Sequence, residues 1–282
     1  MSAKSMVKVD LFPVHKESSI PAIARTVHRA FSSDPLIRWL RPNATPWAQQ
    51  DTGTGSWQYR RIQRIMFEGE VFRSGDVEQM ADKFPQRARS KVSTCTPAVS
   101  VTTQPEKEPK IWMEGDGGIN SSRQDAGAVV FLFPPPGRAS WSLPRIWLAC
   151  KLWFLECLTP AHDSGVREKR VQVLMEKHDE SVKLLEATFP KQKLWYLEVI
   201  AVHPSLQSRG LGGGVMRWAL EHAQNEPVYL ECTREENIGF YESFGFEVAE
   251  VVEMFEDGSH RDGDGDQGFK HWVMVHPGKN GS

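Results

Sequence analysis

The sequence predicts an α/β fold with a mixed central sheet. In the C-terminal third, short apolar or alternating segments follow one another with helical segments between them, in the order strand, helix, strand, helix, strand, strand. That order is typical of a mixed sheet flanked by helices. Hydrophobic residues make up 40% of the 282 residues and include 10 tryptophans, so the chain can bury a sizeable core.

The N-terminal part is predicted to be mainly helical. Ser18 or Ser19 can cap a first helix, and Asp34 before a proline predicts the start of a second, short helix. A third helical pattern is interrupted on its apolar face by Gly69. The expected elements are a strand over residues 7–14 and helices over residues 20–31, 35–40 and 57–72.

Two polar stretches interrupt the pattern and are predicted to be flexible inserts. Residues 84–110 are rich in Ser, Thr, Pro and Lys, and residues 115–127 are polar and rich in glycine. Residues 110–113, between them, can form a short strand. We expect one domain over residues 1–282, with these inserts and with a distinct C-terminal half at 194–276.

The middle of the chain contains a continuous apolar run and two helical segments. Residues 128–133 (AVVFLF) precede three prolines and predict a central strand. Residues 143–158 and 166–189 predict helices, the first with an aromatic face that we expect to pack in the core or to line a pocket. Cys150 and Cys157 lie two turns apart on that face, so we expect buried free thiols.

The C-terminal third has the clearest periodicity. The predicted strands are residues 194–202, 228–232, 246–255 and 269–275, and the predicted helices are residues 212–224 and 235–244. The acidic loop at 257–267 has some DxDxD character, but it lacks the bidentate glutamate of a calcium loop. We therefore expect a solvated hairpin loop and no metal site.

Composition argues against two classes of partner. The formal net charge is −2 and no basic stripe is present, so no nucleic-acid partner is expected. The N-terminus lacks an apolar signal segment, and the most apolar window, 143–158, is short and contains Arg145 and Lys151. We expect a cytoplasmic protein without a membrane partner, and the sequence does not indicate the oligomeric state.

A glycine-rich turn joins the strand at 194–202 to the helix after it. Gly210 and Gly212 allow the backbone to approach a ligand closely, and the free amides of the helix N-terminus form an anion site that suits a pyrophosphate. A P-loop would end in Gly-Lys-Ser/Thr, which is not present. A Rossmann fingerprint needs G-x-G-x-x-G, and here no third glycine stands at the right place. An ordinary glycine-rich turn remains the structural alternative.

The context of this turn resembles the GNAT superfamily of N-acetyltransferases. Residues 207–212 have the Q-x-x-G-x-G spacing of that superfamily, after a strand, LEVIAVHP, that looks like its fourth strand. The downstream segment YLECTREENIGFYESFGFEV resembles its second signature. Residues 228–248 and the ending HWVMVHPG at 271–278 are most similar to the puromycin N-acetyltransferase type. The resemblance is strong over about 80 C-terminal residues and implies the GNAT fold, whose sheet splays at the fourth strand.

This resemblance implies a binding site for acetyl-CoA as co-substrate. Free backbone groups of the fourth strand would pair with the pantetheine arm, and the amides of the turn would hold the pyrophosphate. Arg209 either adds a charged contact or points outward, and Asn237 either binds the pantetheine or caps a helix. The implied cofactor-binding residues are Ile200, Ala201, Val202, Gln207, Ser208, Arg209, Gly210, Leu211, Gly212, Gly213 and Asn237.

Two residues are candidates for the chemistry. Tyr241 lies at the position of the general acid in such enzymes and can protonate the thiolate leaving group, or it is a packing tyrosine. Glu198 can take a proton from the amine, or it is an ordinary strand carboxylate. By strand alternation Tyr196 and Ile200 are expected on the same face as Glu198.

The expected reaction is direct transfer of acetyl to an amine, because neither Cys95 nor Cys232 has a visible histidine partner that would make it a nucleophile. A small-molecule amine is the favoured acceptor because the resemblance is closest to an enzyme of that kind. Two alternatives remain open. One is a protein or peptide N-acetyltransferase, and the other is a CoA-binding module without catalysis.

Overall fold

The computed structural model describes residues 7–42, 52–85, 123–138, 143–158, 165–256 and 268–279. Its strands form a seven-stranded sheet in the order β1-β2-β3-β4-β5-β7-β6, and every neighbouring pair except β4 and β5 is antiparallel. The strands are β1 Phe12–Pro13, β2 Glu70–Arg73, β3 Ala128–Phe133, β4 Trp195–Val202, β5 Val228–Cys232, β6 Glu247–Met254 and β7 Phe269–His276. The predicted α/β fold with a mixed sheet is therefore confirmed.

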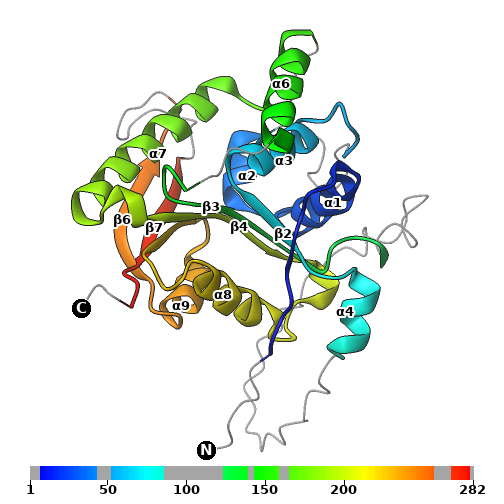
Figure 1. Ribbon diagram of the computed structural model, residues 1–282. Helices are drawn as coiled ribbons and strands as arrows, with labels where there is room; N and C mark the ends of the chain where they lie inside the picture. Colours follow the sequence, from blue (N-terminus) through cyan, green and yellow to red (C-terminus); the bar gives the residue numbers. More distant parts are fainter. Residues whose placement is uncertain are drawn as a thin grey trace, which may run out of the picture.

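Helices cover both faces of this sheet (Figure 1). On one face, α8 and α9 lie beneath β4 and β5 with α4 at the edge, and on the other face lie α1, α2, α3 and α7, with α6 stacked outside α3. The helices are α1 Ile20–Ala30, α2 Pro35–Leu40, α3 Trp57–Glu68, α4 Val77–Lys83, α6 Leu143–Leu158, α7 Glu168–Thr188, α8 Leu211–His222 and α9 Ile238–Glu242. None of the described helices combines the length and apolarity needed to span a bilayer.

The centre of the sheet consists of β3 and β4. Residues 128–132 of β3 are fully buried, which agrees with the predicted central strand at 128–133. Two antiparallel neighbours can be joined by a two-residue turn. Here residues 134–194 lie between β3 and β4 and contribute α6 and α7. This long connection places α7 over the β5–β7 side of the sheet, where it contacts β6.

The strands β4 and β5 are parallel neighbours for only two residue pairs. Trp195 pairs with Val228 and Tyr196 with Tyr229, and the pairing then ends within the described strands. The helix α8 provides the crossover between them, as parallel strands require. Beyond Tyr196 the two strands diverge, so the splay implied by the resemblance is present.

A β-bulge in β4 lies next to this divergence. Val199 pairs with Phe131 and Leu197 with Leu132, so Glu198 is the extra residue. Bulges change the direction of side chains and are frequent beside active sites. The strand residues packed towards α8 are Trp195, Leu197, Ile200 and Val202, and those packed towards the opposite face are Tyr196, Val199 and Ala201. The expectation that Tyr196, Glu198 and Ile200 share one face is therefore wrong, because the bulge reverses the alternation.

Several N-terminal elements differ from the prediction. The expected strand at 7–14 is reduced to β1, although Val9 and Leu11 are buried against the α8 side. Ser19 is the N-cap of α1, but its side chain makes no cap hydrogen bond. The helix expected at 57–72 ends at Glu68, and Phe72 lies in β2. Gly69 ends this helix because a Cβ there would come within 2.7 Å of the Leu132 carbonyl oxygen.

The helix at 143–158 has the predicted bounds but a different environment. Trp147 and Trp153 are 62% and 70% exposed, and Cys150 and Cys157 are exposed free thiols. The expectation of a core helix with buried thiols is wrong, because α6 packs against α3 on a narrow face that includes Leu148. Apolar periodicity alone did not distinguish this outer position from a buried one.

Other predictions fall outside the described residues or at their edge. The insert at 84–110 from residue 86 onward, the strand at 110–113, Cys95 and the loop at 257–267 lie outside them. The second insert, 115–127, ends within them, and there Asp125 and Ala126 are fully buried. The last residues of that stretch therefore belong to the core.

Candidate functional site

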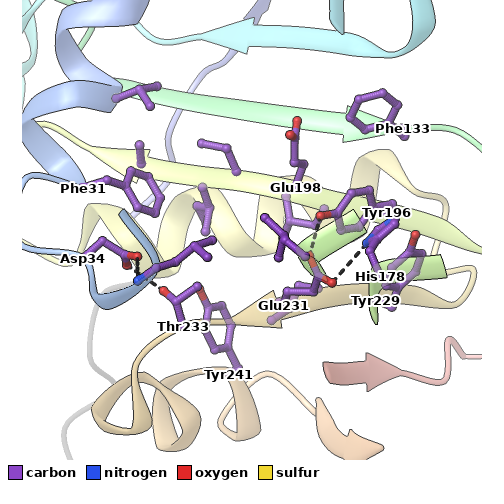
Figure 2. A pocket seen from close by; sticks show the side chains of 18 of the residues that line it. Phe31, Asp34, Phe133, His178, Tyr196, Glu198, Tyr229, Glu231, Thr233 and Tyr241 are labelled. Carbon is purple, nitrogen blue, oxygen red and sulfur yellow. Dashed lines mark hydrogen bonds and ion pairs between the residues drawn. The ribbon is translucent and has the colours of Figure 1, made fainter. Parts of the chain in front are cut away.

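A cavity of about 710 Å³ lies where β4 and β5 separate, on the face covered by α1, α2 and α7. It has two ends (Figure 2). At one end are Asp34, Thr233 and Tyr241, and at the other are Tyr196 and Glu231. Glu198 lies between these ends, on the β4 side. The divergence of the two strands therefore produces an opening that side chains from both strands line.

The edge of β4 that faces β5 has no strand partner after Tyr196 within the described residues. On its other edge, Ile200, Ala201 and Val202 pair with β3. Backbone groups of the free edge can therefore pair with an extended ligand, as a strand added to a sheet would. All three residues line the cavity.

The turn after β4 begins beside the cavity, which Gln207 lines, and leads to a set of free backbone amides. Gly210 is the N-cap of α8 with a φ of 84°, and Ser208 has a φ of 61°. The Gly214 amide donates to the Gly210 carbonyl, so the amides of residues 211–213 are the ones left free by helix geometry. These amides and the helix dipole favour an anion at this position.

The glycines of this helix have different neighbours. Gly212 and Gly213 lie beside the rings of Phe240 and Phe244, at ordinary packing distances. A Cβ on Gly214 would lie 2.7 Å from the carbonyl oxygen of Val7. Gly214 therefore allows the N-terminal segment to pack against α8, while the preceding glycines face α9.

Two polar side chains of the turn hold its shape. Gln207 donates to the Val202 carbonyl over 3.1 Å. The Arg209 guanidinium donates to the carbonyls of Phe84 and Ser205 over 2.7 and 2.9 Å. In this structure Arg209 therefore links the turn to the end of α4.

Below the turn, His203 anchors the end of β4 to a buried ion-pair cluster. Asp125 is fully buried and accepts a hydrogen bond of 2.5 Å from Arg25, with Arg29 at 3.4 Å. His203 Nε2 lies 3.7 Å from the same carboxylate. Burial and, to a smaller extent, the charge of Arg29 together lower the pKa of His203 to about 4. His203 is therefore neutral in the folded protein at pH 7.

Tyr241 and Asn237 lie on the short helical segment after β5. Burial raises the pKa of the Tyr241 phenol above its ordinary value, with smaller contributions from Cys232 and Asp34. The phenol therefore keeps its proton at neutral pH. Asn237 is exposed at the rim of the cavity and occupies the N-cap position of α9, but its side chain makes no cap hydrogen bond there.

Glu198 projects from the bulge of β4 and is paired with Arg61 of α3. The distance from Arg61 Nη2 to Glu198 Oε1 is 2.6 Å. The other carboxylate oxygen, Oε2, is buried and has no hydrogen-bond partner among the described residues. The Glu198 carboxylate is thus held by one arginine, with its second oxygen available to a group that enters the site.

Glu231 of β5 occupies the closed end of the cavity. His178 Nδ1 lies 3.1 Å from one carboxylate oxygen, and the Tyr196 hydroxyl donates to the other over 2.9 Å (Figure 2). Burial alone would raise the pKa of Glu231, but the hydrogen bond and charge of His178, with His271 and Tyr196, outweigh it and lower the pKa. Glu231 is therefore ionised.

Aromatic rings surround this carboxylate. Tyr196 and Tyr229 are stacked with their centroids 4.6 Å apart, and Phe133 stacks on the other side of Tyr196 at 5.8 Å. The His178 ring lies 5.2 Å from that of Tyr196. A carboxylate among aromatic faces is an environment that suits a cationic or aromatic ligand.

The opposite end contains a second buried carboxylate. Asp34 caps α2 by accepting from the Leu36 amide, and it accepts a hydrogen bond of 2.6 Å from Thr233. Burial raises the pKa of Asp34, although Thr233 and the backbone oppose the shift. This contact fixes α2 over the end of β5, close to Tyr241.

Comparison with known proteins agrees with this geometry. Residues 156–246 match the model of the family described as "Acetyltransferase (GNAT) family". This match covers 91 of the 282 residues. The protein is an acetyltransferase, and the segment that resembles the GNAT family includes the free edge of β4, the turn and Tyr241. Within the described residues, no group of three His, Cys, Asp or Glu side chains is arranged to hold a metal ion.

Several solved structures are similar to this chain, and the one with a TM-score above 0.5 supports the fold. The arylalkylamine N-acetyltransferase 2 of Aedes aegypti is 10% identical with a TM-score of 0.52, and the match covers 95% of this chain and 98% of that one. A histone acetyltransferase HPA2-related protein of Corynebacterium glutamicum is 14% identical with a TM-score of 0.45, over 96% and 97% of the chains. The ribosomal-protein-S18-alanine N-acetyltransferase of Escherichia coli is 25% identical with a TM-score of 0.25, over 31% and 59%.

The structure brings most of the predicted site residues of the acetyltransferase to one place. Glu198, Tyr241, Asn237, Gln207 and the three strand residues 200–202 line the cavity, and the amides of 211–213 lie in the turn beside it. No described residue of α6 lines it, so the aromatic helix is not a wall of this pocket. Sequence reasoning did not select Arg61, Asp34, His178 or Glu231 as site residues, although all four line the cavity.

Proposed function

We propose that this protein transfers an acetyl group from acetyl-CoA directly to the amine of a small molecule. One observation carries the proposal. The free edge of β4 runs into an amide-rich turn, and the cavity along this edge also contains Tyr241, Glu198 and Glu231. A linear thioester ligand with a pyrophosphate fits the free strand edge and the turn. An amine fits the cavity with its acidic side chains.

The donor would be held mainly by backbone groups. Ile200, Ala201 and Val202 would pair with the pantetheine arm, and an amide of this edge would polarise the thioester carbonyl. The amides over 207–213 would hold the pyrophosphate, in particular the free amides of Leu211, Gly212 and Gly213, next to Ser208 and Gly210. Arg209 supports the shape of the turn, and Asn237 would donate from its side-chain amide to the pantetheine.

The chemistry would need one acid and one base at the opening. Tyr241 keeps its proton at neutral pH and would give it to the departing thiolate. Glu198 would act as base towards the attacking nitrogen through its free oxygen. Cys232 is buried and burial raises its thiol pKa, which supports direct transfer over a covalent cysteine intermediate.

The acceptor would be a compact amine that reaches the aromatic, acidic end of the cavity. Glu231 and the rings of Tyr196, Tyr229 and Phe133 provide complementary charge and stacking faces. The cavity volume of about 710 Å³ is in the range of small-molecule binding sites. The similarity of 228–248 and 271–278 to the puromycin N-acetyltransferase type is part of this proposal, as is a single catalytic domain over 1–282.

The test is a CoA-release screen over a library of amines, with wild type, Glu198→Gln and a matched control. Glu70→Gln is the control, because Glu70 pairs with His222 outside the cavity. We expect release with at least one small amine, about 10²-fold slower with Glu198→Gln and unchanged with Glu70→Gln.

Three outcomes would overturn parts of the proposal. Activity on peptides but on no small amine would support a peptide acetyltransferase. Tight acetyl-CoA binding without CoA release from any acceptor would support a non-catalytic module. A rate of CoA release that is the same in Glu198→Gln and wild type would remove Glu198 from the role of base.

A further inference from the structure

An ammonium acceptor loses two protons on its way to a neutral amide. One leaves before the nitrogen can attack, because a protonated amine has no free electron pair. The other leaves as the C–N bond forms. Glu198 is proposed to take the proton that the nitrogen loses during attack, so the first proton needs a separate base in the cavity. The inference that follows rests on the proposed amine acetyltransfer.

His178 is placed by the long connection between β3 and β4. It lies on α7, and its side chain is 21% exposed where it lines the cavity. Its Nδ1 atom contacts Glu231 at 3.1 Å, and its ring packs against Tyr196. Its Nε2 atom has no hydrogen-bond partner among the described residues. The connection thus brings a titratable ring to the place where β4 and β5 separate, although His178 belongs to neither strand.

The contact with Glu231 decides which nitrogen can accept a proton. Glu231 is ionised and can only accept a hydrogen bond, so Nδ1 of His178 carries the hydrogen. In the neutral ring, Nε2 then has the free electron pair. A carboxylate that fixes a histidine tautomer in this way is the arrangement that prepares imidazole bases in hydrolases.

The charges around His178 favour proton uptake. The hydrogen bond from His178 to Glu231 raises the pKa of His178, and this effect outweighs burial. The groups that act on this ring or on its partner are Glu231 and Tyr229 of β5, Asp179 of α7, Glu198 and Tyr196 of β4 and His271 of β7. A base whose pKa lies near the working pH is the most effective proton acceptor.

The two candidate bases differ in how they are held. Glu198 is paired with the fixed positive charge of Arg61 at 2.6 Å, and its free oxygen is enclosed. His178 is paired with the negative charge of Glu231 and reaches the cavity. A carboxylate partner favours a histidine that gains a proton, because its negative charge stabilises the imidazolium. The two groups therefore suit two different proton transfers.

We propose that Nε2 of His178, oriented by Glu231, takes the proton that the acceptor ammonium must lose before attack. The N–H bond of the ammonium breaks, its electron pair stays on nitrogen, and His178 becomes an imidazolium stabilised by Glu231. The neutral amine then forms the C–N bond while the C–S bond breaks, Glu198 takes the second nitrogen proton, and Tyr241 protonates the sulfur. His178 is a catalytic residue in this scheme, and Glu231 is a positioning residue.

The experiment compares two acceptors of the same shape that differ in protonation. One is a primary alkylamine found active in the CoA-release screen, and the other is its β,β-difluoro analogue, which is mostly neutral at pH 8. We expect His178→Gln to lower kcat/KM for the alkylamine by about 10²-fold and to spare most of the activity on the analogue. Glu198→Gln should slow both acceptors.

Glu231→Gln tests the positioning role through the pH profile. The rate should rise with pH as His178 loses its proton in the free enzyme. Removing the Glu231 charge removes the cause of the raised His178 pKa, so the acidic limb should move to lower pH. A merely structural role of Glu231 would lower the rate at all pH values without moving this limb.

A matched control separates the proposal from effects on folding. His222→Gln breaks another histidine–glutamate pair, with Glu70 at 2.7 Å, outside the cavity, and should leave both acceptors unaffected. Thermal unfolding midpoints of all variants show whether they fold. Equal loss on both acceptors in a folded His178→Gln variant, or an unmoved limb in Glu231→Gln, would overturn the inference. No CoA release by wild type with any amine would instead overturn the proposed function.

Discussion

The two sides of the opening between β4 and β5 are built in different ways. The side that we propose for the donor, called the donor side, consists of residues 200–213 and 237–246, which offer backbone amides, a left-handed glycine and one phenol. The acceptor side consists of Glu198, Glu231, His178 and Tyr196, with side chains from α7, β4 and β5. The donor side is two nearby stretches of sequence, whereas the acceptor side is assembled by the fold.

This difference teaches where specificity can change. A backbone site for a constant ligand depends on conformation, so few side chains in it need a fixed identity. A side-chain site for a variable ligand depends on which residues the connections bring in. The helix α7 belongs to the connection at 134–194, so the acceptor can change with this connection while β4 and the turn stay the same.

The largest expected effect concerns the one side chain of the donor side that we assign to chemistry. Tyr241→Phe should lower kcat about 10²-fold or more and leave KM for acetyl-CoA unchanged, because it removes a proton donor and no backbone contact. Tyr59→Phe is the control, since Tyr59 packs in the core outside the cavity. Steady-state kinetics measure both constants. A raised KM with unchanged kcat would show that Tyr241 binds the donor and gives no proton.

A smaller effect concerns His203, the titratable residue under the donor turn. Its pKa of about 4 in the folded state lies below the ordinary value of about 6.5, so protonation favours unfolding. Unfolding free energy should fall by about 3 kcal/mol from this group as pH decreases from about 6.5 to 4. In His203→Asn, which keeps an acceptor for the Ser205 amide, this part of the pH dependence should disappear.

Urea unfolding at a series of pH values measures this difference. CoA release at pH 7 provides the comparison with the acceptor side, because His203 supports the turn without taking part in the chemistry and should leave kcat nearly unchanged. Identical pH dependence of stability in the two proteins would contradict the neutral, buried state of His203.

The smallest expected effect tests the backbone conformation of the donor side. Gly210→Ala places a Cβ on a residue with a φ of 84° and 3.3 Å from Val7, so it should destabilise the fold by about 1 kcal/mol. It should raise KM for acetyl-CoA and leave KM for the amine unchanged. Gly55→Ala is the control because its Cβ would meet no atom within 4 Å. An equal rise of both KM values would mean that the two sides are not independent.

Local signals predicted a large part of the fold. The strands at 128–133 and 228–232 and the helices at 35–40 and 143–158 have the expected bounds, because apolar runs and the Asp34 cap are local features. The expected strand at 7–14 and the helix end at Phe72 were wrong. A two-residue strand and a strand directly after Gly69 leave little periodicity to detect.

The candidate site was predictable only in part for the same reason. Gln207, Gly210 and Gly212 form a short spacing pattern, and Tyr241 follows in a second one. Glu231 lies in a strand pattern that gives no sign of function. His178 lies on a helix whose pattern gives no sign of function either. The bulge at Glu198 depends on its pairing with β3, which no local pattern shows.

The sequence by itself determined the donor side, because a strand, a glycine turn and a helix N-terminus are consecutive, and their backbone geometry follows from residue type. Only the tertiary structure decided the acceptor side. There the divergence of β4 from β5 opens the cavity, and α7 adds His178 to Glu231 across 53 positions of sequence. Contacts over such separations depend on the packing of whole elements, and packing is settled when the chain folds.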